Sequence, residues 1–325
     1  MDYYLGVDGG GSKTLAVVCD ESGRIAGRAV SGCGNHQLGV ELAQRNIRAA
    51  VGEALQQARI GKEQVVRSVF GLAGADREAD FRSLRPMIAE LDMGDHEIVC
   101  DTVIGLRAGT KQAHGVVVIC GSGTNCYGIN RQGEELQVGG FGYAFGDFGG
   151  GSDLAVEVFR SVIRAWEGRE RSTLLSEPAL RMLAMASEEE MFHHYLDHER
   201  RIPRDLAKLL FEVAEQDETA QSILAKQGRE LGKAAGAVIR KLRMEDDQFD
   251  LVMAGSILTR GDSRYILPHL DAQIRELAPG CEPTVLTLEP VAGALFMAIG
   301  QEESVDKEVY DRIHHQLSIK AASVS

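Results

Sequence analysis

A glycine-rich turn near the start of the chain restricts the fold more than any other segment. The residues Asp8-Gly9-Gly10-Gly11-Ser12-Lys13-Thr14 follow a strand-like segment, Tyr4 to Val7. A P-loop is excluded, because that motif needs a glycine where Ser12 stands and a helix after the threonine. Here two more strand-like segments follow, Leu15 to Cys19 and Ile25 to Val30. The chain is therefore predicted to begin as an antiparallel meander.

The same pattern occurs a second time. The segment Val116 to Cys120 leads into Gly121-Ser122-Gly123-Thr124-Asn125, another strand-like segment and a tight turn at Asn130 to Gly133. A chance repeat of a common hairpin is the alternative, but strand length, turn type and the following turn recur together. The 325 residues, 44% of them hydrophobic, also exceed one core. We therefore predict two related domains, 1–113 and 114–325, with a hinge near residues 110–116.

Strand and helix patterns alternate in the rest of the chain, which is typical of an α/β fold. Residues Ser152 to Leu242 are predicted to form a helical insertion in the second domain, broken near Pro178 and Pro203. The C-terminal tail from Gln301 is expected to pack back on the first domain. The other expected helices are Val40 to Ala58, Asp80 to Leu91, one ending near Leu277 and Val291 to Ile299, and the other expected strands are Ser68 to Leu72, Glu97 to Cys100, Phe249 to Met253 and Val285 to Leu288.

Both glycine turns suit anions, because glycines let successive backbone N–H groups converge on one. Ser12 and Thr14 add hydroxyl groups and Lys13 adds a positive charge. Asp8 would repel a phosphate here unless a divalent cation lay between them, so Asp8 indicates Mg²⁺, bound directly or through water. For one turn alone, an ordinary hairpin with local aspartate hydrogen bonds stays an alternative. Together with a strand that ends in Ala254-Gly255-Ser256, the turns favour a nucleotide held between the domains.

Charge and cysteine content narrow the function further. The formal net charge is -13, so a nucleic acid or an anionic membrane would be repelled. The six cysteines form no C-x-x-C pair, and no leader segment is recognised, which predicts a reduced, cytoplasmic protein. His193, His194 and His198 share a predicted helix, but a solvated face is favoured over a metal site. A homodimer is expected, with the helical insertion offering surface for it.

Four motifs, taken in order, resemble the BadF/BadG/BcrA/BcrD ATPase family, specifically its N-acetylglucosamine kinase-like branch. They are Gly6 to Thr14, Gly71 to Asp76, Cys120 to Asn125, and Gly139 to Gly142 followed by Gly146-Asp147. The resemblance implies two ribonuclease H-like domains of the actin and hexokinase type with a central ATP cleft. It implies adenosine contacts at Gly255 and Ser256, and phosphate contacts at Gly9, Gly10, Gly11, Ser12, Lys13, Thr14, Gly121, Ser122, Gly123 and Thr124.

Asp101 is the catalytic base that the resemblance implies. It follows the strand-like Ile98-Val99-Cys100, and active groups of open α/β sheets gather at the carboxyl ends of strands. A carboxylate there would accept the proton of a sugar hydroxyl as that hydroxyl attacks the γ-phosphate. Capping of a helix that begins near Thr102 is the alternative role, and the two roles are compatible.

Sugar-contacting positions of the family are matched by Asn35, Asp101, Gly140, Phe141, Gly142 and Asp147. Amide and carboxylate groups suit hydroxyls and an aromatic ring suits the apolar face of a pyranose, although Asn35 and Asp147 alone also fit loop and capping residues. Phe141 stands where related kinases commonly have Trp, and Phe148 and Gly150 replace a common Glu and Ser. The resemblance implies phosphorylation of an amino sugar at the 6-hydroxyl by Mg²⁺ and ATP. N-acetylglucosamine is the first expectation, and glucosamine or N-acetylmuramic acid are the alternatives.

Two functions of other classes stay open. An ATPase that activates a partner redox enzyme would carry a cluster on suitably placed cysteines, whereas Cys120 and Cys126 lie in the second hairpin and the next cysteine is Cys281. A sugar sensor would bind without turnover. No helix-turn-helix segment precedes Tyr4, which argues against a DNA-binding sensor.

Overall fold

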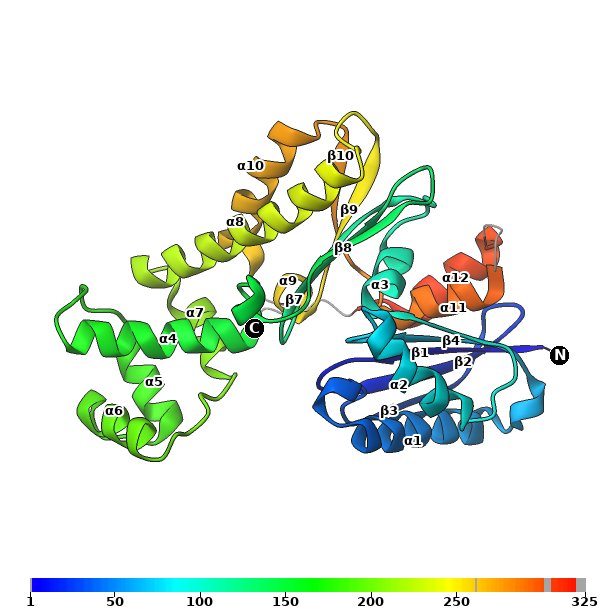
Figure 1. Cartoon of the computed structure of the whole chain (residues 1–325), viewed down its shortest axis with the longest axis horizontal. Helices are drawn as coiled ribbons and strands as arrows, with labels where there is room; N and C mark the ends of the chain where they lie inside the picture. The colour runs from blue at the N-terminus through cyan, green and yellow to red at the C-terminus, as the bar shows by residue number, and fades with distance from the viewer. Residues whose placement is uncertain (1, 261, 301–304, 320–325) are drawn as a thin grey trace.

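The computed structural model describes residues 2–260, 262–300 and 305–319, and they form two five-stranded sheets flanked by helices (Figure 1). The first sheet has the order β3-β2-β1-β4-β5 and consists of β1 (Tyr3–Gly9), β2 (Thr14–Asp20), β3 (Ile25–Ser31), β4 (Val65–Leu72) and β5 (His96–Cys100). The second has the order β10-β9-β6-β7-β8 and consists of β6 (Gly115–Cys120), β7 (Thr124–Ile129), β8 (Glu135–Gly139), β9 (Phe249–Ala254) and β10 (Cys281–Val285). The predicted α/β class is confirmed.

Both sheets are built on the same plan. Each begins with a three-stranded antiparallel meander, β1-β2-β3 or β6-β7-β8, as predicted. The first strand of each meander also pairs in parallel with a later strand, β4 in the first sheet and β9 in the second. The first hairpin tip therefore lies at the same sheet edge as the carboxyl end of β4, and the second tip lies beside the carboxyl end of β9. This arrangement collects loop residues at one edge of each sheet.

One face of the first sheet is covered by α1 (Val40–Ala58) and α2 (Glu78–Ala89), as Figure 1 shows. Alternate strand residues point to this face, among them Leu5 and Val7 of β1 and Val18 of β2. Apolar residues recur at helical spacing on α1, whose range is as predicted, and its buried residues are Ala43, Ile47, Ala50, Val51, Ala54 and Leu55.

A second apolar cluster joins the two sheets. It contains Leu15 of the first sheet, Val117 and Val252 of the second, and residues of α3 (Asp101–Gly109) and α11 (Val291–Gly300). The two helices touch at the level of their backbones, because a Cβ atom on Gly293 of α11 would collide with the carbonyl oxygen of Ile104. The helix that begins with Asp101 is thus fixed between both sheets.

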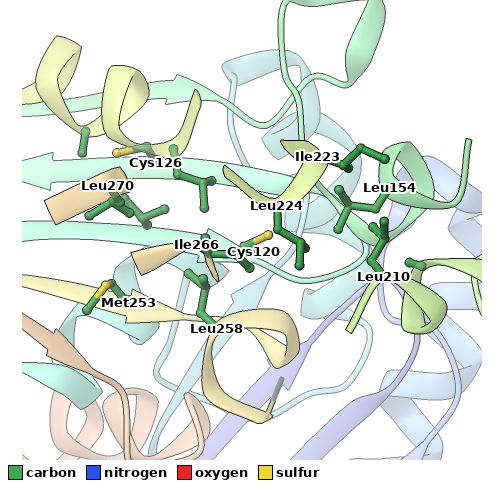
Figure 2. Packing of buried hydrophobic residues seen from close by; sticks show 14 of the residues in the cluster. Cys120, Cys126, Leu154, Leu210, Ile223, Leu224, Met253, Leu258, Ile266 and Leu270 are labelled. Atoms are coloured by element: carbon green, nitrogen blue, oxygen red, sulfur yellow. The ribbon is translucent and has the colours of Figure 1, made fainter. Parts of the chain in front are cut away.

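The other face of the second sheet packs against helices, and five of them lie between β8 and β9. These five are α4 (Gly151–Trp166), α5 (Ser176–Leu183), α6 (Glu188–Asp197), α7 (Leu206–Val213) and α8 (Glu218–Lys241). Figure 2 shows their shared core, in which Cys120 and Cys126 of the sheet cluster with Leu154, Leu210 and Leu224 of the helices. α10 (Leu267–Leu277) adds Leu270 to this core, whereas α4 to α7 extend away from the first sheet (Figure 1).

The last helix, α12 (Lys307–Leu317), packs on the turn between β2 and β3. The guanidinium of Arg312 donates to the carbonyl of Ser22 at 2.7 Å, and the Gln316 amide donates to the carbonyl of Gly23 at 3.0 Å. This helix therefore contacts the first sheet, whereas residues 301–304 and 320–325 of the expected tail lie outside the described residues. The domain boundary at 113/114 and the hinge stay predictions.

Most expected elements are confirmed to within a few residues, and one expected strand is wrong. β10 covers Cys281–Val285 rather than Val285 to Leu288, because Pro283 is tolerated in an edge strand. The break expected near Pro178 is confirmed between α4 and α5, and Pro178 itself lies in the first turn of α5, where a backbone N–H is not required. The break near Pro203 is confirmed. No helix in the described part of the chain combines the length and hydropathy needed to cross a membrane.

Replacing Gly293 by Ala tests the contact between α3 and α11. We expect the variant to unfold with a lower midpoint in thermal denaturation, because overpacking costs about 1–3 kcal/mol or more. Gly52→Ala is the matched control, since Gly52 lies on the exposed side of α1 with nothing within 4 Å of an added Cβ. This control should raise stability slightly. Equal behaviour of the two variants would contradict the close contact.

Candidate active site

The hairpin tips and strand ends of both sheets line one cavity of about 330 Å³. This volume is within the range of small-molecule sites. Of the residues predicted for the site, the lining contains Asp8, Gly10, Gly11, Ser12, Lys13, Asn35, Asp101, Gly121, Ser122, Gly123, Thr124, Gly140, Gly255 and Ser256. The fold therefore brings together residues that are far apart in the sequence.

The first glycine turn is held in shape by its own backbone and by the following loop. The N–H of Gly10 donates to the carbonyl of Lys13 at 2.8 Å, which closes the tip between β1 and β2. The N–H of Gly34 in turn donates to the carbonyl of Gly10 at 2.9 Å. This second bond places Asn35, the next residue, beside the turn.

The second glycine turn faces the first across the cavity. A Cβ atom on Gly11 would lie only 3.5 Å from the Oγ atom of Ser122. The start of α4 supports this turn, because the N–H groups of Gly151 and Ser152 donate to the carbonyls of Gly121 and Ser122 at 2.8 and 3.2 Å. Two turns of this kind, one from each sheet, can contact the same polyphosphate.

The far end of the cavity is formed where β9 ends and α9 (Ser256–Arg260) begins. Gly255 has a φ of +91°, and an added Cβ would collide with the backbone of Cys120. Only glycine fits this close approach. Ser256, Thr259 and Pro290 also line the cavity.

Two carboxylates stand in the cavity at strand ends. Asp8 belongs to β1, and Asp101 follows β5 as the first residue of α3. Burial and the nearby charge of Asp101 raise the pKa of Asp8 to about 7, although Lys13 acts against this rise. Burial also raises the pKa of Asp101 to about 6, with the Cys100 hydrogen bond opposing it and the charge of Asp76 adding to it. Raised carboxylate pKa values of this kind are typical of groups that handle protons or bind cations.

Asn35 lies at the end of the cavity near the loop that follows β4. Its Oδ1 atom accepts the N–H of Gln37 at 2.8 Å and so caps a short helix at His36–Leu38. Gly74 has a φ of +83°, and an added Cβ would lie 3.1 Å from Oδ1 of Asn35. The loop Ala73 to Asp76 therefore packs directly against Asn35.

Five predicted residues do not line this cavity: Gly9, Thr14, Phe141, Gly142 and Asp147. Gly9 lies within β1, and the buried hydroxyl of Thr14 donates to the carbonyl of Gly32 at 2.9 Å. The Asp147 carboxylate accepts the N–H groups of Gly140 and Gly142 at 3.0 and 2.6 Å, so it shapes its own loop.

Phe141 and Phe148, the two aromatic residues that differ from those common in related kinases, occupy different surroundings. Phe141 is 43% exposed, and its ring centroid lies 6.0 Å from the guanidinium carbon of Arg77, which belongs to the first half of the chain. Phe148 is buried, and the ammonium of Lys226 on α8 lies 3.9 Å from its ring centroid. Phe148 is also absent from the lining of the cavity.

Sequence reasoning missed five polar lining residues: Gln37, Asp76, Asn125, Thr259 and Glu289. Asp76 and Asn125 each belong to a motif that was recognised, but neither was given a role. The position of Asp76 after β4, beside the carboxyl end of β5, was the signal that could have identified it.

Two other features of the described residues are separate from this cavity. A larger cavity, of about 770 Å³, lies at the opposite end of α3 and contains neither glycine turn.

Within residues 2–260, 262–300 and 305–319 no group of three or more His, Cys, Asp or Glu side chains is arranged to hold a metal ion. The rings of His194 and His198 stack on the helix surface with centroids 4.9 Å apart.

Comparisons with known proteins identify relatives of this chain. The chain is 29% identical to N-acetyl-D-glucosamine kinase of Dictyostelium discoideum over 318 residues, which cover 93% of this chain and 99% of that protein. It is 29% identical to N-acetylmuramic acid/N-acetylglucosamine kinase of Clostridium acetobutylicum over 271 residues, 82% of this chain and 88% of that one.

A solved structure has the same fold. It is that of a provisionally assigned N-acetylglucosamine kinase from Chromobacterium violaceum, with a TM-score of 0.69, 20% identity and coverage of 92% of this chain and 99% of that one. The BadF/BadG/BcrA/BcrD ATPase family model matches residues 5–298. The chain therefore belongs to the BadF/BadG/BcrA/BcrD ATPase family.

Proposed function

We propose that this protein is an ATP- and Mg²⁺-dependent kinase that phosphorylates N-acetylglucosamine, or a closely related amino sugar, at its 6-hydroxyl. The observation that carries the proposal is the position of Asp101, which stands in the same cavity as two facing glycine turns. The names of the amino sugar kinases similar to this chain support the same substrate class.

The reaction needs alignment more than covalent chemistry. The turns at Gly10 to Lys13 and Gly121 to Thr124 would hold the phosphates, and Gly255 and Ser256 would lie against the adenosine. Asp101 would accept the proton of the 6-hydroxyl as its oxygen attacks the γ-phosphorus and the bond to the ADP oxygen breaks. Closure of the two halves would exclude water, which otherwise competes with the sugar for the phosphoryl group.

Asp8 is the residue that fits a magnesium ion. Its carboxylate lies at a strand end beside the first glycine turn. Its raised pKa shows that the negative charge of the carboxylate is poorly compensated by the surrounding groups. A single carboxylate, with water and phosphate oxygens as further ligands, is a usual donor set for Mg²⁺. When bound, the ion would neutralise charge on the phosphates.

The sugar would bind between Asn35, the loop at Gly140 and Asp101. In this proposal Asp147 acts by holding the amides of that loop, and Phe141 covers the sugar when the cleft closes. Glucosamine and N-acetylmuramic acid remain the alternative substrates. A homodimer and a cytoplasmic location stay predictions.

The two alternative functions have less support. A cluster-bearing activator would need accessible cysteines, but only Cys33 is partly exposed and the other five are buried. A sensor would need no proton acceptor, and replacing Asp101 distinguishes it from a kinase.

Asp101→Asn should reduce kcat by roughly 10²–10⁴-fold, because the amide cannot accept the hydroxyl proton. Binding of ATP, measured by calorimetry, should be unchanged. The control is Asp95→Asn, which alters an exposed carboxylate paired with Arg67 at the other end of β5. Turnover of Asp101→Asn equal to wild type would remove Asp101 from the mechanism.

The pH dependence follows from the same residue. Since the pKa of Asp101 is raised to about 6 and the base acts as a carboxylate, kcat/KM should rise with pH through about 6 and then level off. The rise should be measured at saturating Mg²⁺ and ATP with the sugar varied. A limb centred near pH 4, the ordinary range for aspartate, would contradict the assignment.

Asp8 should make the metal-free protein less stable as pH rises. In the folded state the Asp8 carboxyl keeps its proton up to about pH 7, whereas in the unfolded chain it loses the proton near pH 4. The free energy of unfolding therefore falls as pH rises across that interval. Asp8→Asn should therefore melt at a higher temperature than wild type at pH 8 without Mg²⁺, and the difference should shrink toward pH 4.

Asp20→Asn is the matched control, and its melting temperature at pH 8 is expected to change in the opposite direction. Hydrogen bonds from Ser22 and from the N–H of Arg24 lower the pKa of Asp20 despite its partial burial, so this carboxylate stabilises the fold above about pH 4. Asp20→Asn should melt below wild type at pH 8. A lower melting temperature for both variants would contradict the account of Asp8.

A further inference from the structure

We propose that Asp76 is a sugar-binding residue of the cleft and that the Cys100 thiol is a positioning residue that holds Asp76 and Asp101 toward the same edge of the substrate. The inference rests on the proposed kinase function and extends it to two residues without an assigned role.

The topology places the two carboxylates side by side. β4 and β5 are adjacent parallel strands with Leu72 opposite Cys100, so the residues that follow them meet at one sheet edge. Asp101 comes directly after β5 and Asp76 comes four residues after β4. Both line the cavity, and Asn35 packs against the loop that carries Asp76.

Cys100 connects the pair. Its Sγ atom lies 3.2 Å from Oδ1 of Asp76 and 3.3 Å from Oδ1 of Asp101. Burial, together with the charges of Asp101 and Asp76, raises the pKa of Cys100 well above its usual range, so the group is a thiol at working pH. One S–H can donate to only one carboxylate at a time. The thiol therefore fixes the spacing of the pair and leaves acceptor capacity for another donor.

Two acceptor atoms of residues that line the cleft lack a hydrogen-bond donor within the described part of the chain. Oδ2 of Asp76 and Oδ1 of Asn125 are buried and meet no donor among the described residues, although both side chains line the cavity. An unpaired buried acceptor is costly, so a partner that brings hydrogen-bond donors is favoured. Among the described residues that line this cavity, Lys13 is the only one with a cationic side chain, and it belongs to the first glycine turn.

The chemistry of these acceptors selects the ligand. Hydroxyl and amide N–H groups of a sugar donate to carboxylate and amide oxygens, whereas phosphate oxygens would be repelled by Asp76. The geometry thus assigns Asp76 and Asn125 to the sugar, on the side of the cleft where Asn35 lies, and assigns the glycine turns to ATP.

Steady-state kinetics of Asp76→Asn tests the inference. With N-acetylglucosamine varied at saturating Mg²⁺ and ATP, the sugar KM should rise roughly tenfold or more, since a hydrogen bond to a charged group is lost. The KM values for ATP and Mg²⁺ should stay as in wild type. An unchanged sugar KM, or a raised requirement for Mg²⁺ instead, would overturn the assignment. Asp76→Ser repeats the test if the asparagine variant does not fold, and Asp95→Asn is the control.

Cys100→Ala and Cys100→Ser test the positioning role. The alanine variant should lose kcat and raise the sugar KM, because neither carboxylate is then held, while serine, which keeps a donor, should restore both. Equal activity of the two variants, whether high or low, would overturn the role of the thiol.

Calorimetry of N-acetylglucosamine binding separates this inference from the proposed function. Weaker sugar binding by Asp76→Asn in a protein that does not turn over would refute the kinase and support Asp76. Turnover by wild type together with unchanged binding by Asp76→Asn would refute Asp76 alone, and a wild type that binds no amino sugar would refute both.

Discussion

The contact between α3 and α11 holds the two halves of this protein in the relation that the site requires. The helices approach so closely that Gly293 has no room for a side chain against Ile104, and apolar residues from both sheets close around them. Because α3 begins with Asp101, the packing that joins the sheets also sets the direction of the proposed base. A shift of α3 would move the carboxylate relative to both glycine turns, and small misplacements of reacting groups are costly in rate.

The buried carboxylates of the site lower the stability of the empty protein and favour the binding of ligands that compensate their charge. Asp8 and Asp101 share a cleft in which burial raises the pKa of both carboxyl groups. A protein selected for stability alone would not keep these charges at the edge of a sheet. A cation, a polyphosphate and a hydroxylated sugar together supply what the cleft lacks: positive charge near Asp8, anions for the glycine turns and donors for the acceptors near Asp101.

Much of this architecture could be predicted because its signals are local. Glycine turns between strand patterns identified both hairpins, and helical spacing identified α1 to the residue. What failed depends on tertiary contacts. Thr14 belongs to a motif that suits phosphate binding, but its hydroxyl donates a hydrogen bond to the carbonyl of Gly32. The Asp147 carboxylate accepts hydrogen bonds from backbone N–H groups of its own loop. Asp76 lies near Asp101 because β4 pairs in parallel with β5, and that pairing joins segments that are far apart in the sequence.

The central claim is that the cleft transfers the γ-phosphoryl group of ATP to a sugar hydroxyl. The most direct measurement incubates the protein with Mg²⁺, ATP and N-acetylglucosamine and identifies the products by phosphorus NMR. The account predicts equal amounts of ADP and N-acetylglucosamine 6-phosphate, with little inorganic phosphate. ADP accompanied by inorganic phosphate and no sugar phosphate, for this sugar and for glucosamine and N-acetylmuramic acid, would contradict it.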